Sequence, residues 1–224
     1  MLKLNGCRIL ASMNNLTSTQ TMARVAANAL PIYRGYRGFA TAERLKSDMQ
    51  DPADRTWQFA RRVAFDASTD MADGVLARIA GATILGGFLD QMADKFWYHL
   101  PVRQLVKNGE LSHYHEDLPL SRDIGGTAIR LWKLSQGRSA DAKRSGKDKY
   151  IIQATALTSI CSPMAVIAPD LVRSLFDISV GLSVVSGYEM LRDVNNILDE
   201  YSAEVPVLQT VSRLLDSQLD AIAA

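Results

Sequence analysis

Aspartates recur at helical spacing inside an otherwise apolar stretch of the chain, residues 70–95. Asp70 and Asp73 are three residues apart, and after a short connection Asp90 and Asp94 are four residues apart. Residues three and four apart share one face of an α-helix. Aspartate is a poor helix former, so its repetition here needs a reason beyond local structure. The spacing predicts two helices, joined as a hairpin, whose facing sides carry four carboxylates.

Four carboxylates brought together between two helices repel one another unless cations neutralise them. A site built from oxygen ligands suits Mg²⁺ or Mn²⁺, and such ions typically hold a diphosphate for displacement. The spacing therefore predicts metal-assisted chemistry on a phosphate ester. The alternative is a pair of amphipathic helices whose acidic faces are solvated.

The rest of the sequence also favours helix. Long segments are rich in Ala, Leu, Met, Gln and Arg, and alternation with a period of two is sparse, so a sheet is not expected. We therefore predict an all-α fold in a single domain of residues 1–224. Prolines predict the breaks between helices, at Pro31, Pro101, Pro119, Pro163, Pro169 and Pro206.

Charge and cysteine content exclude several classes of protein. The formal net charge of the 224 residues is +1, which gives no reason to expect nucleic acid as a partner. Cys7 and Cys161 lie far apart and lack metal-ligand spacing, so neither a disulfide framework nor a zinc site is expected.

Hydropathy leaves open whether the chain crosses a membrane. A spanning helix needs about 20 mainly apolar residues. Residues 150–169 carry no formal charge and are the best candidate, and residues 174–188 carry only Asp177. Charges inside a span are tolerated where they line a water-filled cavity. Hydropathy alone does not predict a span over residues 57–78, because they contain six charged residues: Arg61, Arg62, Asp66, Asp70, Asp73 and Arg78.

The aspartate stretch resembles the signature of the CDP-alcohol phosphatidyltransferase family, D-x-x-D-G-x-x-A-R, eight residues, then G-x-x-x-D-x-x-x-D. Every fixed position matches, but seven residues instead of eight separate the two halves. The shortening falls between the two helices, so we expect the hairpin to survive it, while the register of the aspartate pairs stays open. The matching residues are Asp70, Asp73, Gly74, Ala77, Arg78, Gly86, Asp90 and Asp94.

The resemblance extends to both sides of the signature. Thr21 to Arg24 is similar to the T-x-x-R of the family's first helix, and Ser186-Gly187 resembles the S-G near its last helix. A further pattern is most like that of phosphatidylglycerophosphate synthases, R-E…R…G-K-x-K-T-x-x-Q. Its residues here are Arg122, Asp123 in place of Glu, Arg130, Gly146, Lys147, Lys149, Tyr150 in place of Thr, and Gln153.

The resemblance implies a polytopic membrane bundle of about six transmembrane helices, assembled as a homodimer and surrounded by membrane lipid. It also implies an enzyme integral to the cytoplasmic membrane, with its active site at the cytoplasmic face. Mg²⁺ or Mn²⁺ would be held by Asp70, Asp73 and Asp90, and Asp94 would complete this set as the general base. The substrate-binding residues would be Gly74 and Arg78 against the CDP part of the donor, together with Ala77, Gly86 and Thr21.

The implied reaction transfers a phosphatidyl group from CDP-diacylglycerol to an alcohol and releases CMP. Asp94 would take the proton of the acceptor hydroxyl, which attacks the phosphorus that bears the lipid. Arg122, Arg130 and Lys147, with Lys149, would clamp a phosphorylated acceptor, and glycerol 3-phosphate is the first choice. These cations could instead follow the positive-inside tendency of membrane proteins. Serine and inositol phosphate are the alternative acceptors.

Two other classes of protein are compatible with parts of the pattern. A soluble helical enzyme acting on prenyl diphosphates also holds Mg²⁺ with aspartates on facing helices, but it would carry D-D-x-x-D clusters, and the sequence has none. A non-catalytic helical membrane protein is the second alternative. The four aspartates argue against it, because a purely structural role gives no reason for them.

Overall fold

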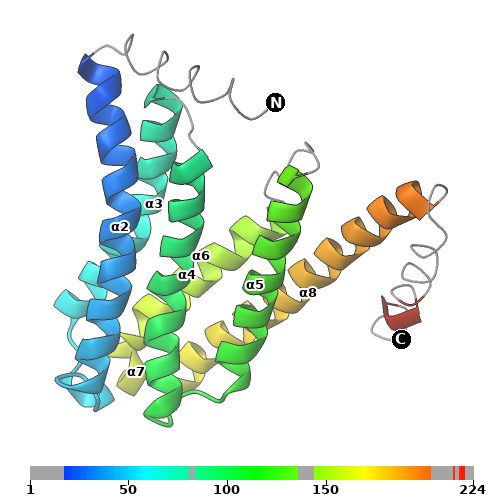
Figure 1. The fold of residues 1–224 in the computed structure, drawn as a ribbon. Coiled ribbons are helices and arrows are strands. Elements are labelled where there is room, and N and C mark those ends of the chain that lie inside the picture. Colours follow the sequence, from blue (N-terminus) through cyan, green and yellow to red (C-terminus); the bar gives the residue numbers. More distant parts are fainter. Residues whose placement is uncertain (1–17, 81–83, 136–143, 203–213, 215–216, 220–224) are drawn as a thin grey trace. The chain divides into compact units, whose positions relative to one another are not determined.

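The computed structural model describes residues 18–80, 84–135, 144–202, 214 and 217–219 (Figure 1). Their regular structure is helical throughout, and no strand occurs among them. The all-α prediction is therefore confirmed. The chain divides into two compact units, residues 1–104 with 161–163 and residues 105–160 with 164–224. The single domain of residues 1–224 stays a prediction.

The first unit is built on three long helices. α2 (Ser18–Lys46) and α3 (Trp57–Ala80) lie side by side and are joined by a turn that contains a short 3-10 helix, η1 (Pro52–Asp54). α4 (Ile84–Lys107) follows and lies mostly in this unit. The Thr56 hydroxyl accepts a hydrogen bond from the backbone N–H of Phe59 at 3.2 Å, which caps the start of α3.

Glycines let α2 pass very close to α4. A Cβ atom built on Gly38 would lie 2.5 Å from the Cα of Trp97 and 2.6 Å from the carbonyl oxygen of Phe96. About one turn earlier, a Cβ on Gly35 would lie 3.8 Å from the Cα of Ala93. The contacts advance in the same direction along both helices, so α2 and α4 run parallel.

Apolar side chains from all three helices fill the interior of the first unit. Trp97 is the largest of them and is 1% exposed, beside the α2–α4 contact. The other buried apolar residues of this unit are Leu45, Phe59, Ala60, Val63, Ala93, Tyr98 and Val102.

The second unit is organised around its longest helix. α8 (Pro169–Ser202) packs against α5 (Tyr114–Ser135), α6 (Arg144–Ile160) and the short α7 (Met164–Ile167). The chain leaves α4 through Gly109, whose φ of 79° is a left-handed conformation that glycine adopts without strain. The N–H groups of Gly109 and Glu110 close this helix end on the carbonyls of Val106 and Leu105, each at 3.0 Å.

The Asp177 carboxylate on α8 holds the start of α5 in place through two hydrogen bonds. Asp177 accepts hydrogen bonds from the Tyr114 hydroxyl at 2.7 Å and from Nε2 of His115 at 3.0 Å. Nδ1 of His115 accepts from the backbone N–H of Ser112 at 3.2 Å, so Nε2 is the nitrogen that carries the proton. His115 is buried and its ring packs edge-on against Phe176.

The prolines interrupt helices less often than the sequence predicts. Pro31, Pro101 and Pro119 lie inside α2, α4 and α5 and are fully buried, so their prediction as helix breaks was wrong. Their packing against neighbours outweighs one missing backbone hydrogen bond each. The prolines on either side of α7 do mark breaks. Pro206 lies outside the described residues.

One helix in the described part of the chain, α8, is long and apolar enough over Pro169–Ile197 to cross a membrane. It contains the predicted segment 174–188. The segment 150–169 is not one helix, because α6 ends at Ile160 and α7 begins at Met164, so its prediction as a single span was wrong. The described residues do form six long helices: α2, α3, α4, α5, α6 and α8.

We expect Gly38→Ala to lower the free energy of unfolding by about 1–3 kcal/mol, because its new methyl group would overlap backbone atoms of α4 that cannot swing aside. Gly181→Ala on α8 is the matched control, since a Cβ there meets nothing within 4 Å. The control should be neutral or stabilising by up to about 1 kcal/mol. Thermal unfolding followed by circular dichroism compares the two variants. Equal melting temperatures would contradict the close α2–α4 contact.

Candidate functional site

Two aspartates of α4 converge on one buried guanidinium of α2. Arg34 has no exposed surface and forms ion pairs with Asp90 through Nη2 and with Asp94 through Nε, the latter 2.8 Å from Oδ1. The two carboxylates lie one helical turn apart and share a face, as their spacing predicts. Their side chains are 37% and 29% exposed, so both remain accessible from outside the protein.

The close packing of α2 against α4 is what brings Arg34 to these carboxylates. Arg34 precedes the contact at Gly38 by one turn, so its side chain reaches α4 without leaving the interior. A buried guanidinium is costly unless it is neutralised and hydrogen-bonded. Two carboxylates surround it here, and the cluster of Arg34, Asp90 and Asp94 therefore keeps one negative charge in excess.

This acid pair fits a divalent cation. Its donors are carboxylate oxygens, which Mg²⁺ and Mn²⁺ prefer, and the excess negative charge attracts a cation. Asp90 and Asp94 alone make an incomplete set of ligands. In the described ranges no group of three or more histidine, cysteine or acidic side chains lies together. Asp70 and Asp73 lie on α3, but their side chains fall outside the described residues.

The register of α2 and α3 relates the backbone position of Asp70 to that of Arg34. Asp66 of α3 contacts Arg37 of α2. The two helices run antiparallel, so one turn forward on α3, about 5.4 Å, corresponds to one turn back on α2. The backbone at Asp70 is therefore level with Arg34, the residue that holds Asp90.

The helices also place the other residues of the signature. Their side chains fall outside the described residues, so only the elements that carry them are known. These residues are Gly74, Ala77 and Arg78 on α3, Gly86 on α4 and Thr21 on α2.

A second polar network is buried in the second unit, where α5, α6 and α8 meet. Arg122 donates from Nη1 to Oδ1 of Asp123 at 2.9 Å and from Nη2 to the hydroxyl of Ser186. Lys149 of α6 donates to the same oxygen of Asp123. Asp123, Lys149 and Ser186 are all more than nine-tenths buried. The structure thus brings together four residues that the sequence pattern singled out separately.

Small residues and unused donors surround this network. Gly187 and Gly126 lie against the side chain of Arg122, and Cβ atoms built on them would be at ordinary contact distance from it, 3.4 Å and 3.7 Å. Gln153 follows Lys149 by one turn and is 3% exposed. Among the described residues, Nε2 of Gln153 and Nε of Arg122 have no hydrogen-bond partner. A bound anion or hydroxyl group would satisfy such donors.

The two remaining predicted cations differ in their surroundings. Arg130 lies two turns after Arg122 on α5 and is half-buried, within electrostatic range of Arg122 and Asp123. Lys147 is exposed on α6.

Sequence reasoning missed Arg34. The signal was weak: Arg34 and Arg37 are three residues apart and end a long stretch whose only other basic residue is Arg24. Their partners lie on other helices, 56 residues away for Asp90 and 29 for Asp66, so no local spacing reveals them.

Comparisons with known proteins agree with the resemblance seen in the sequence. A family model described as CDP-alcohol phosphatidyltransferase matches residues 16–186. Two proteins named probable phosphatidylglycerophosphate synthase, from Mycobacterium tuberculosis strains CDC 1551 / Oshkosh and ATCC 25618 / H37Rv, are each 31% identical to this chain over 134 residues. These matches cover 58% of this chain and 64% of each relative, slightly less than two thirds of the relatives' length.

We expect Arg34→Leu to lower the free energy of unfolding by about 1–3 kcal/mol, because it leaves two carboxylates without their cation. Adding Asp90→Asn to this variant should restore part of the loss by removing one of those charges. Arg173→Leu, which removes an exposed arginine of α8, should stay within about 0.5 kcal/mol of the parent. Chemical denaturation measures all three. An Arg34→Leu protein as stable as the parent would contradict the buried ion pairs.

Proposed function

The chain belongs to the CDP-alcohol phosphatidyltransferase family, a family of transferases, and we propose that it moves a phosphatidyl group from CDP-diacylglycerol to glycerol 3-phosphate. CMP is the second product. The observation that carries this proposal is the acid pair Asp90 and Asp94, held around Arg34 at the last two aspartates of the family signature. The relatives named phosphatidylglycerophosphate synthase support glycerol 3-phosphate as the acceptor.

In this proposal Asp70, Asp73, Asp90 and Asp94 hold Mg²⁺ or Mn²⁺ ions. Metal ions held there would supply positive charge against the diphosphate of the donor and the departing CMP. Arg34 supplies a fixed positive charge inside the protein. Its ion pairs hold the Asp90 and Asp94 side chains in place and leave their accessible side open to a second cation.

Asp94 is the proposed general base. It accepts the proton of the acceptor hydroxyl, whose oxygen forms a new bond to the phosphorus that bears the lipid. The bond from this phosphorus to the CMP oxygen breaks, and the electron pair leaves with CMP. The contact between Nε of Arg34 and Oδ1 of Asp94 fixes the orientation of the carboxylate during this step.

The donor's CDP group would lie against α3 and the start of α4. Gly74 and Arg78 are proposed to contact it, and the small residues Ala77 and Gly86 would allow its close approach. Thr21 on α2 would complete this part of the site. These roles come from the family signature.

The buried network of the second unit is proposed to bind the phosphate of the acceptor. Glycerol 3-phosphate brings a dianion, and Arg122 offers it a positive charge and the unused donor Nε. Lys149 and the unused Nε2 of Gln153 add further donors, while Arg130 and Lys147 add positive charge. A buried cationic network favours a phosphorylated acceptor over serine, and inositol phosphate is the alternative with the same chemistry.

The proposed setting is a homodimer in the cytoplasmic membrane, with six spanning helices and the active site at the cytoplasmic face. The composition of α8 supports a span there. α3 contains six charged residues, but its Asp66 is 1% exposed and paired with Arg37. Pairing removes most of the cost of placing such a charge among apolar surroundings.

Asp94→Asn should lower the rate of transfer by about 10²–10⁴-fold, because asparagine keeps the shape of aspartate but cannot take a proton. The measurement is CMP release from CDP-diacylglycerol in detergent with Mg²⁺ and glycerol 3-phosphate. Asp54→Asn, at an exposed aspartate of η1, is the control and should keep the parent rate. Undiminished turnover of a folded Asp94→Asn protein would remove Asp94 as the base.

Arg122→Gln should raise the KM for glycerol 3-phosphate by about tenfold or more, since a charge-assisted contact is lost. The KM for CDP-diacylglycerol should not change. Lys149 still pairs with Asp123 in this variant, so the fold is expected to persist. Arg192→Gln, at an exposed arginine of α8, serves as the control. Equal changes in both KM values would contradict a specific role in acceptor binding.

A further inference from the structure

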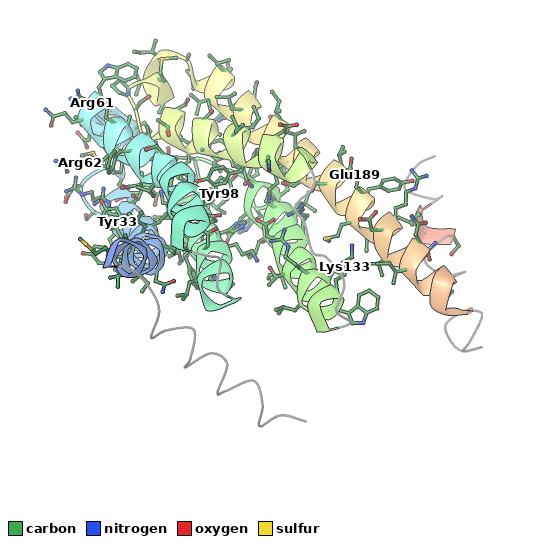
Figure 2. The ribbon with its side chains drawn as sticks, turned by 90° about the horizontal axis from the view of Figure 1, so that it is seen from above. Tyr33, Arg61, Arg62, Tyr98, Lys133 and Glu189 are labelled. Atoms are coloured by element: carbon green, nitrogen blue, oxygen red, sulfur yellow. The ribbon has the colours of Figure 1, made fainter. Side chains whose placement is uncertain are left out.

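A pocket of about 310 Å³ opens on the first unit between α2 and α3. Its walls include three arginines, two aromatic rings and one aspartate. In Figure 2, the labelled side chains of Tyr33, Arg61 and Arg62 lie along the same side of this helix pair. The residues that matter here are Arg37, Arg61, Arg62, Tyr33, Phe65 and Asp66.

Asp66 and Arg37 form a fixed and electrically neutral part of the wall. Asp66 is 1% exposed, and its two oxygens lie 3.2 Å and 3.0 Å from Nε of Arg37. The Tyr33 hydroxyl donates to Oδ1 of Asp66 at 3.4 Å. The charge of Arg37 is thus balanced inside the protein.

Arg61 and Arg62 have no such balance. Both are exposed, and in the part of the chain that the structure describes neither has an acidic partner within ion-pair distance. The pocket therefore carries two positive charges in excess. Two guanidinium groups at one concave surface offer several donors in forked geometry, which matches the oxygens of a phosphate group.

The rim of the pocket is apolar and exposed. Phe65 is 62% exposed and Tyr33 is 41% exposed. On the adjoining surface of α2, Ile32 and Tyr36 are 63% and 64% exposed. Exposed apolar side chains beside unbalanced cations suit a phosphate that is attached to hydrocarbon chains better than a free phosphate ion.

The unbalanced arginines of the pocket lie away from the aspartates of the signature. Arg61 and Arg62 lie in the second turn of α3, whereas Asp70, the first of these aspartates, is eight residues beyond Arg62. At the rise of an α-helix this is about 12 Å along the axis. We propose that this pocket binds the phosphate group of an anionic phospholipid, at a second site that takes no part in transfer. The proposal takes only its membrane setting from the proposed function.

Lipid binding by the purified full chain in a neutral detergent tests this directly. Fluorescently labelled phosphatidylglycerol is titrated against the parent and against a variant with Arg61→Gln and Arg62→Gln. We expect the variant to bind at least about tenfold more weakly, since two charge-assisted contacts are lost. A variant with Lys107→Gln and Arg173→Gln removes two exposed cations outside the pocket and should bind like the parent.

Competition identifies the ligand. Unlabelled phosphatidylglycerol should displace the label, while phosphatidylcholine and inorganic phosphate at the same concentration should not. Displacement by phosphatidylcholine as strong as by phosphatidylglycerol would overturn the proposal, as would an unchanged affinity in the Arg61 and Arg62 variant. Inorganic phosphate that competes as well as the lipid would overturn the assignment to a phospholipid.

Transfer activity separates this inference from the proposed function. Arg61 and Arg62 have no role in the proposed reaction, so CMP release should match the parent in their double variant. If transfer occurs but lipid binding does not depend on Arg61 and Arg62, the second site is contradicted and the proposed function stands. If lipid binding depends on these arginines but no transfer occurs, the proposed function is contradicted and the second site stands.

Discussion

The ion pairs of Arg34 with Asp90 and Asp94 determine what the first unit can do. A guanidinium with no exposed surface destabilises a protein unless anions surround it, and here two carboxylates do so. The arrangement depends on α2 lying against the backbone of α4, which the glycine at position 38 permits. The packing of α2 against α4 and the position of the acid pair therefore depend on the same few residues. The result is a pair of ordered carboxylates with excess negative charge. Such a pair can bind a cation, which in turn would bind a phosphate group.

Charged residues inside these helices are paired far more than the sequence suggests. Asp66 is neutralised by Arg37, and Asp123 by Arg122 and Lys149, all within the described interior. Such pairing lets helices of modest hydropathy pack together or lie in lipid without exposing charge. Among the described residues, Arg61 and Arg62 instead lie exposed at one pocket with an apolar rim, and this contrast is why a lipid phosphate is assigned there.

Local spacing in the sequence predicted the helical fold, the shared face of Asp90 and Asp94, and the family. The family and the helical fold could be predicted because the spacing of the signature residues reflects the geometry of a helix, which depends on residues close in sequence. Arg34 could not be predicted in this way, because its partners lie on another helix, the nearer of them, Asp90, 56 residues away. The helix break predicted at Pro163 is present, but the single span predicted over residues 150–169 ignored it, because the absence of charge does not show where a helix ends. Three buried prolines were predicted as breaks because propensity ignores the packing that stabilises them.

All the proposed roles depend on metal-dependent phosphatidyl transfer by this chain. The measurement to make is CMP release from CDP-diacylglycerol, using protein purified in detergent and glycerol 3-phosphate, serine, inositol and inositol phosphate offered separately. We expect CMP release that requires Mg²⁺ or Mn²⁺ and glycerol 3-phosphate together. Release that persists in a metal chelator, or no release with any acceptor from protein shown to be folded, would contradict it.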